Sequence, residues 1–161
     1  MRQEEFERLY EDHAQGLLAF LAYRTGDRSL AEDLLADTFE RVLRARRRFD
    51  PRKGSRKTWI YSIALNLLRD QVRRREAEGR AMERVTEPAP SAVGSIRQIA
   101  ERDELARALA ELSEEEREAI ALRYGGDLTV PEIARLTGEK LTTIEGRVYR
   151  GLRKLRELLG E

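Results

Sequence analysis

The stretch from Gly79 to Ser95 divides the chain into two parts. It contains two glycines, two prolines and two serines, and its apolar residues keep no helical period. Such a composition is typical of a flexible linker. On both sides of it, apolar residues recur every three or four positions, which is the period of an amphipathic helix. The sequence therefore predicts an all-α protein of two small helical domains, at residues 1–78 and 96–161, joined by a linker at 79–95.

Local signals indicate where the helices begin and end. In the first part, Ser29 is expected to open the second helix, because Glu32 follows it at the spacing of a capping box. A loop at 49–54, punctuated by Pro51 and Gly54, should precede a third helix at about 55–78. In the second part, Ser113 with Glu116 has the same capping spacing.

The composition excludes several kinds of function. Without cysteine, the chain has no disulfide, no thiol nucleophile and no zinc site with cysteine ligands. The single histidine, His13, argues against a histidine-based triad or a multi-histidine metal site. Adjacent acids such as Glu32-Asp33 do not face each other on a helix, so we expect no enzyme, no metal and no cofactor. The chain has neither a signal peptide nor an apolar run of about 18 residues, which predicts no membrane insertion.

The net charge of +1 hides an alternation of acidic and basic segments. Residues 1–40 carry −6 and residues 41–75 carry +11, whereas residues 101–120 carry −5 and residues 135–156 carry +5. Two separate basic segments suggest two contacts with a polyanion such as DNA. The alternative is that these arginines only form solvated helix faces.

Residues 128–148 fit a helix-turn-helix. A short helix at 129–137 would meet a last helix at 142–159 through a tight turn at Gly138. Ile144 and Val148, four apart, would return to the core and leave the other face for a major groove. The candidate DNA contacts on that face are Thr142, Thr143, Glu145, Arg147, Arg150 and Lys154. The alternative is an ordinary helical hairpin with a glycine turn.

The third helix carries a second candidate surface. Asn66, Arg69 and Arg73 are spaced by three and four, so they share one helix face. An amide between two arginines suits contact with bases and phosphates together. The alternative is a buried Asn66 amide, with the arginines only decorating the helix end.

Taken together, three stretches resemble the extracytoplasmic-function group of bacterial RNA polymerase sigma factors, in the sigma-70 family. They are 31–42, 59–70 with its trailing arginines, and the helix-turn-helix that ends at 147–156. The resemblance covers nearly the whole chain apart from the linker. It implies a protein that binds core RNA polymerase and directs promoter-specific initiation by recognising −10 and −35 elements.

The resemblance also implies roles for particular residues. The second helix would dock on the clamp helices of the polymerase β′ subunit through Asp33, Leu34, Asp37, Thr38 and Arg41. The loop and the third helix would capture the unpaired −10 strand through Arg52, Lys53, Arg56, Lys57, Asn66, Arg69 and Arg73. The second domain would read the duplex −35 element and lie against the β flap, with the linker threading toward the RNA exit path. An anti-sigma factor is the implied negative partner, and the bacterial cytoplasm, on the nucleoid when with polymerase, is the implied location.

The sequence departs from the family pattern at three places. Ala36 stands where glutamine is usual, Glu139-Lys140-Leu141 replaces the usual turn, and Glu145 stands where lysine is common. These departures leave two other interpretations open. One is a stand-alone helix-turn-helix regulator, which would normally need a dimerisation element or ligand pocket. The other is a helical interaction protein that mimics a sigma factor without contacting DNA.

Overall fold

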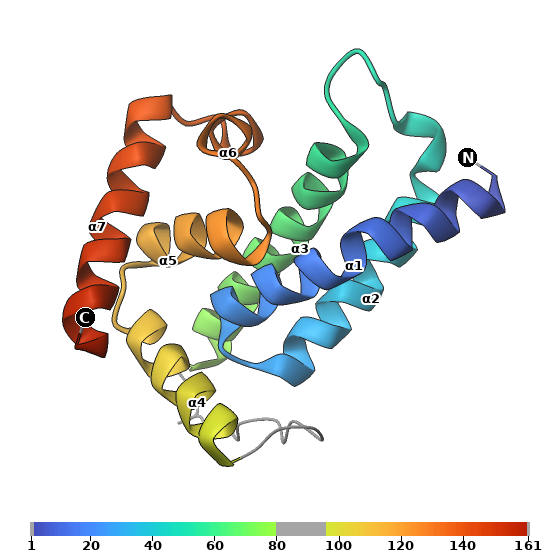
Figure 1. The fold of residues 1–161 in the computed structure, drawn as a ribbon. Helices are drawn as coiled ribbons and strands as arrows, with labels where there is room; N and C mark the ends of the chain where they lie inside the picture. The colour runs from blue at the N-terminus through green and yellow to red at the C-terminus, as the bar shows by residue number, and fades with distance from the viewer. Residues whose placement is uncertain (1, 80–95, 161) are drawn as a thin grey trace.

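The structure, a computed structural model, describes residues 2–79 and 96–160 (Figure 1). These residues form helices and no strand, as the sequence predicted. Beyond Gly79, the predicted linker lies outside the described residues. The first part consists of α1 (Gln3–Thr25), α2 (Arg28–Arg44), the 3-10 turn η1 (Arg46–Arg48) and α3 (Arg56–Gly79). The second part consists of α4 (Ile96–Ala110), α5 (Glu114–Ile120), the π-helical turn η2 (Ala121–Gly125), α6 (Val130–Thr137) and α7 (Leu141–Leu159).

The junction between α1 and α2 corrects one prediction. Gly26 ends α1 in the left-handed conformation, with φ of 68°. Asp27, and not Ser29, is the N-cap of α2, because its carboxylate accepts a hydrogen bond from the N–H of Leu30 at 3.1 Å. Aspartate caps a helix as well as serine does, and here it comes directly after the glycine that turns the chain.

Apolar residues spaced by three and four hold the first part together. Leu17 and Phe20 of α1 pack with Ile60 and Tyr61 of α3, and all four are almost fully buried. The rings of Phe20 and Tyr61 lie 5.9 Å apart at an interplanar angle of 48°, a separation within the contact range of aromatic pairs. The buried stripe of α2, within residues 31–42, completes this core.

Capping boxes fix the starts of α5 and α6. Ser113 and Glu116 form one of them, as predicted, and Thr129 and Glu132 form the other. In each box the hydroxyl accepts from a backbone N–H and the carboxylate accepts from the capping residue's own N–H. Gly138 then ends α6 with φ of 74°, which supplies the predicted tight turn before α7.

The two parts pack directly against each other, which the sequence pattern did not indicate. A Cβ atom on Gly125 would lie 2.9 Å from the backbone of Phe20, so only glycine permits this approach. The Tyr61 hydroxyl donates to the carbonyl oxygen of Gly126 at 3.3 Å. Buried residues of both parts therefore belong to one hydrophobic core, with α5 lying between α7 and the first part (Figure 1).

Candidate nucleic-acid interface

The helices α6 and α7 have the arrangement of a helix-turn-helix. Ile133, Ile144 and Val148 are buried and hold the two helices together, and the sequence predicted this burial for Ile144 and Val148. Gly151 allows α7 to approach α5, because a Cβ there would lie 2.7 Å from the Ile120 side chain. On the outer face, Thr142, Glu145 and Arg150 are exposed, whereas Thr143 and Arg147 are half-buried. Three of the six predicted duplex contacts are therefore fully exposed on α7, and Lys154 is half-buried like Thr143 and Arg147.

Arg147 is paired with the turn that precedes its helix. Its Nη2 lies 3.5 Å from Oε1 of Glu139, one of the residues that depart from the family pattern. Attraction between the two charges favours one orientation of the guanidinium before any DNA is present. A residue in the turn therefore acts directly on a candidate base-reading residue.

Glu116 anchors α7 to α5 through two of the predicted DNA contacts. Its carboxylate accepts a hydrogen bond from Lys154 Nζ at 2.7 Å and lies 3.7 Å from Arg150 Nε. The hydrogen bond from Lys154 is the main cause that lowers the pKa of Glu116, and the cap bonds of Ser113 lower it further, against the opposing effect of burial. Lys154 thus combines a structural role with its predicted phosphate contact.

The five residues of α2 that were predicted to dock on polymerase lie on two different faces of the helix. Asp33, Asp37 and Arg41 are exposed and available to a partner. Leu34 and Thr38 are buried on the opposite face, and the Thr38 hydroxyl donates to the carbonyl oxygen of Leu34 at 2.7 Å. The predicted direct contact of Leu34 and Thr38 with polymerase is therefore wrong. The two residues are four positions apart, so both lie on the apolar stripe of α2 that faces the core.

A cavity of about 240 Å³ lies between the basic loop and α3. Phe49 and Trp59 line it with their rings 5.2 Å apart, and Lys53 lines it as well. Phe49 was not among the predicted site residues, although an aromatic residue at each end of the basic segment, Phe49 and Trp59, was the available signal. The cavity is also lined by Arg135 and Leu136 of α6, so both parts of the chain contribute to it.

The other predicted −10 residues differ in what they contact. Arg52 is exposed, and Arg56 lies over the Phe49 ring at 5.7 Å from its centroid. Asn66 is exposed, which excludes the buried-amide alternative. Arg73 Nη2 bonds Asp70 Oδ1 within α3 at 2.6 Å.

Two residues of this set are held by the second part of the chain. Lys57 Nζ donates to the carbonyl oxygen of Asp127 at 3.2 Å. Arg69 Nη2 donates to Glu118 Oε2 at 3.0 Å. The surface predicted to bind the −10 strand is therefore partly engaged inside the protein in this arrangement.

Residues 2–79 and 96–160 contain no group of three or more His, Asp or Glu side chains placed to hold a metal ion. No helix in this part of the chain is both long enough and apolar enough to cross a bilayer.

The fold and these surfaces define a class: an all-helical protein of two parts, with a basic loop and helix in the first and a helix-turn-helix in the second. Comparison with known families assigns the parts. Residues 9–78 match Sigma-70 region 2, and residues 102–155 match Sigma-70, region 4. The chain belongs to the sigma-70 family of RNA polymerase sigma factors, in its extracytoplasmic-function group.

Individual relatives align with almost the full length of this chain. The chain is 37% identical to the RNA polymerase sigma factor CarQ of Myxococcus xanthus, across 99% of this chain and 91% of CarQ. Its fold is similar to the sigma factor RpoE in a complex with the anti-sigma factor NepR from Bartonella quintana, with a TM-score of 0.80, 27% identity and 98% of both chains covered. It is also similar to CnrH in a complex with the cytosolic domain of CnrY, with a TM-score of 0.76, 26% identity, and 99% and 90% of the two chains covered.

Proposed function

We propose that this chain binds core RNA polymerase and directs it to promoters whose −10 and −35 elements it recognises. The main support is that one chain contains both a region 2 and a region 4 of the sigma-70 family. Region 2 exposes a basic loop and Asn66, and region 4 exposes one face of a helix-turn-helix. This pairing argues against a stand-alone regulator or a mimic that does not contact DNA. We also propose that the protein is not an enzyme and acts in the cytoplasm, where polymerase and template are present.

In this proposal the first domain, residues 1–78, carries polymerase docking and −10 recognition. The exposed side chains of α2, Asp33, Asp37 and Arg41, contact the β′ clamp helices, while Leu34 and Thr38 hold that helix on the core. This proposal is supported by the exposure of these charged side chains, which lie on the face of α2 that does not pack against the described residues.

The −10 strand is proposed to bind along the basic loop and α3. A cavity walled by Phe49 and Trp59 suits an unstacked base, because aromatic rings stack on any base. Arg52, Lys53, Arg56 and Lys57 would contact the backbone around it. Asn66, Arg69 and Arg73 would extend the contact along α3.

The second domain, residues 96–161, is proposed to read the −35 duplex and to lie against the β flap. Thr142, Thr143, Glu145 and Arg147 would face base edges, and Arg150 and Lys154 would contact phosphates. Two weak modules joined by the segment at 79–95 gain effective concentration when polymerase presents both elements at the right spacing.

An anti-sigma factor is the proposed negative partner. In one solved structure of similar fold, the sigma factor RpoE is bound to the anti-sigma factor NepR. In another, CnrH is bound to the cytosolic domain of CnrY. A partner that covers the charged face of α2 would keep this chain from polymerase.

Transcription in vitro tests the proposed function. Genomic fragments are transcribed by purified core RNA polymerase with and without this chain. New discrete start sites that need both components are expected, and their upstream sequences give both elements. Folded protein that yields no new start with polymerase would contradict the proposal.

A further inference from the structure

Gly146 lies in the first half of α7, the helix that carries the predicted duplex contacts. Glycine inside a helix costs more conformational entropy than alanine, so its presence there suggests that a side chain would collide with something. The three atoms nearest to a Cβ on Gly146 would all belong to Arg150, with Nη1 at 2.9 Å and Cζ and Nη2 at 3.6 Å. The missing side chain of Gly146 therefore leaves the space that the Arg150 guanidinium occupies.

Arg150 reaches back along α7 to fill this space. It follows Gly146 by four positions, and helical side chains lean toward the N-terminus of their helix, so its guanidinium lies over the preceding turn. The side chain remains 54% exposed, which leaves the charged group open to a ligand. The guanidinium therefore lies at the level of the residues that are proposed to face the duplex, one turn before its own Cα.

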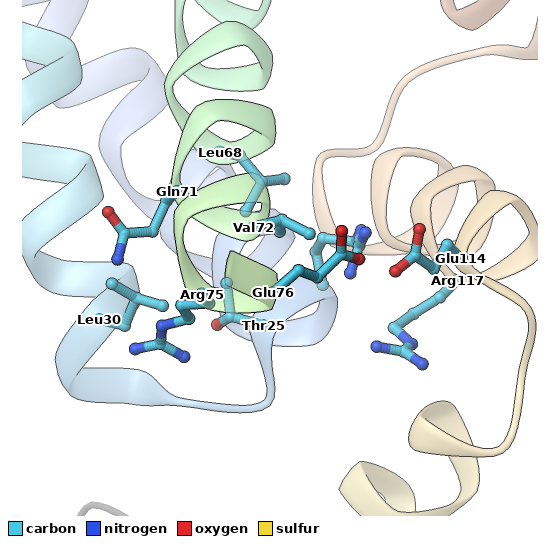
Figure 2. Close-up of a pocket in the computed structure, with 10 residues that line it drawn as sticks. Thr25, Leu30, Leu68, Gln71, Val72, Arg75, Glu76, Glu114 and Arg117 are labelled. Atoms are coloured by element: carbon cyan, nitrogen blue, oxygen red, sulfur yellow. The ribbon is translucent and has the colours of Figure 1, made fainter. Parts of the chain in front are cut away.

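The neighbouring helix α5 presents different side chains to its two sides. Glu114 and Arg117 line a pocket that α5 forms with α1 and α3 (Figure 2). Glu116 instead faces α7, where its Oε2 lies 3.7 Å from Arg150 Nε and its Oε1 accepts a hydrogen bond from Lys154 Nζ at 2.7 Å. The Nε side of the Arg150 guanidinium therefore lies beside a carboxylate of the adjacent helix.

The Glu116 carboxylate is itself fixed in place. It accepts a hydrogen bond from the backbone N–H of Ser113 at 3.1 Å in the capping box, and its side chain is only 7% exposed. The ion pair with Arg150 involves Nε, so the two Nη groups keep their N–H donors for a ligand. A side chain that is already held in position loses less conformational entropy when it binds, which strengthens binding.

We propose that Gly146 is a positioning residue for the −35 contact: it lets the Arg150 guanidinium lie against α7, beside Glu116, where it binds a DNA phosphate. Gly146 itself makes no contact with DNA in this role and acts through Arg150. A guanidinium suits a phosphate because two of its N–H groups can donate to two oxygens. This role rests on the proposed binding of the −35 duplex by α7.

Gly146→Ala tests this role. A Cβ at 2.9 Å from Nη1 should push the flexible end of Arg150 away from the helix, so the fold should persist. Alanine favours a helix more than glycine does, so the Tm should stay the same or rise. Affinity for the −35 duplex should nevertheless fall about threefold to tenfold, and alike for matched and mismatched sequences, because a phosphate contact carries no sequence information. A glycine with a merely structural role would not separate DNA binding from stability in this way.

The measurement is fluorescence anisotropy of the full-length protein with a labelled duplex from upstream of a start site mapped by transcription in vitro. Arg150→Ala should weaken binding about tenfold and make the salt dependence shallower by about one phosphate contact. In the Arg150→Ala background, Gly146→Ala should have no further effect, because it acts only through the guanidinium. A further loss in that background would show that the added methyl group collides with DNA directly, and it would overturn the proposal.

Gly79→Ala is the matched control, since Gly79 is also helical and a Cβ there meets nothing within 4 Å. It should leave affinity for the duplex unaltered. If the parent binds the duplex and Arg150→Ala weakens it, unaltered binding by Gly146→Ala would overturn the positioning role alone. A parent protein that does not bind the −35 duplex would contradict the proposed function as well as this role.

Discussion

Arg69 on α3 holds both carboxylate oxygens of Glu118 on α5. Its Nε lies 3.4 Å from Oε1 and its Nη2 lies 3.0 Å from Oε2. Arg69 is also a proposed contact to the −10 strand, and one guanidinium cannot bind Glu118 and a phosphate in the same way at once. The pair therefore connects domain packing with DNA binding.

Glu118→Gln should weaken the packing of α3 against α5 and strengthen DNA binding. We expect the free energy of unfolding to fall by about 0.5–1 kcal/mol, because Arg69 remains partly in water. Affinity for a fork DNA that carries the −10 sequence should rise about twofold to fivefold, the equivalent of that energy. Urea unfolding and fluorescence anisotropy measure the two effects.

Glu40→Gln is the control for this change, since Glu40 pairs with Arg44 inside α2 at 2.6 Å. It should leave DNA affinity unaltered. Weaker DNA binding by Glu118→Gln would show that the pair orients Arg69 for DNA and does not compete with it.

Arg147→Ala should weaken binding to the −35 duplex by about 1–3 kcal/mol if the guanidinium reads a base by two hydrogen bonds. The loss should then be largest for the correct sequence. Anisotropy with matched and mismatched duplexes measures it. Arg156, an exposed residue near the end of α7, is expected to contact a phosphate, so Arg156→Ala should instead weaken every sequence alike. A uniform loss for Arg147→Ala would assign it to phosphate as well.

Asn66→Ala should reduce transcription from −10-dependent promoters without disturbing the fold. Asn66 is exposed, so the free energy of unfolding should change by no more than about 0.5 kcal/mol. Transcription in vitro and circular dichroism report the two effects. Gln15→Ala, at an exposed polar position of α1, controls for loss of a surface amide. Full activity of Asn66→Ala would remove this residue from the proposed interface.

Gly125→Ala should separate the two parts of the chain. The added Cβ would lie 2.9 Å from the Phe20 backbone, which cannot swing away as a side chain can. We expect a loss of about 1–3 kcal/mol in urea unfolding, as for other overpacked sites. Gly79→Ala is the control, because a Cβ there meets nothing within 4 Å. An equal effect of both changes would argue against the close approach.

Glu116 should make stability depend on acid pH. Its pKa is lower in the folded protein than in the unfolded chain, so its stabilisation is present above the unfolded pKa and is lost as pH falls through the folded pKa. Glu116→Gln should therefore be less stable than the parent at pH 7, with a difference that shrinks on acidification. Urea unfolding across pH 3–7 measures this. A constant difference over that range would contradict the assignment.

Local patterns determined most of the secondary structure. The capping box at Ser113 and the turn at Gly138 depend on residues within one helical turn, so the sequence alone predicted them. Ser29 failed as a cap because Asp27, two residues earlier, offers an equally good acceptor directly after Gly26. The exposed position of Thr142 also followed from helical spacing, whereas that of Asn66 needed the structure, because a buried amide was an open alternative.

Tertiary structure decided what those helices meet. Arg69 and Glu118 are 49 positions apart, and Lys57 and Asp127 are 70 apart, so no local period could pair them. By contrast, the spacing of Leu34 and Thr38 already placed both on the apolar stripe of α2, and their burial removes them from the docking surface. The pocket lined by Arg24, Arg75 and Arg117 exists only because α1, α3 and α5 converge. Sequence by itself therefore determined the helices, the turn and the family, whereas the contact between the domains needed the fold, because side chains distant along the chain meet only when the core has formed.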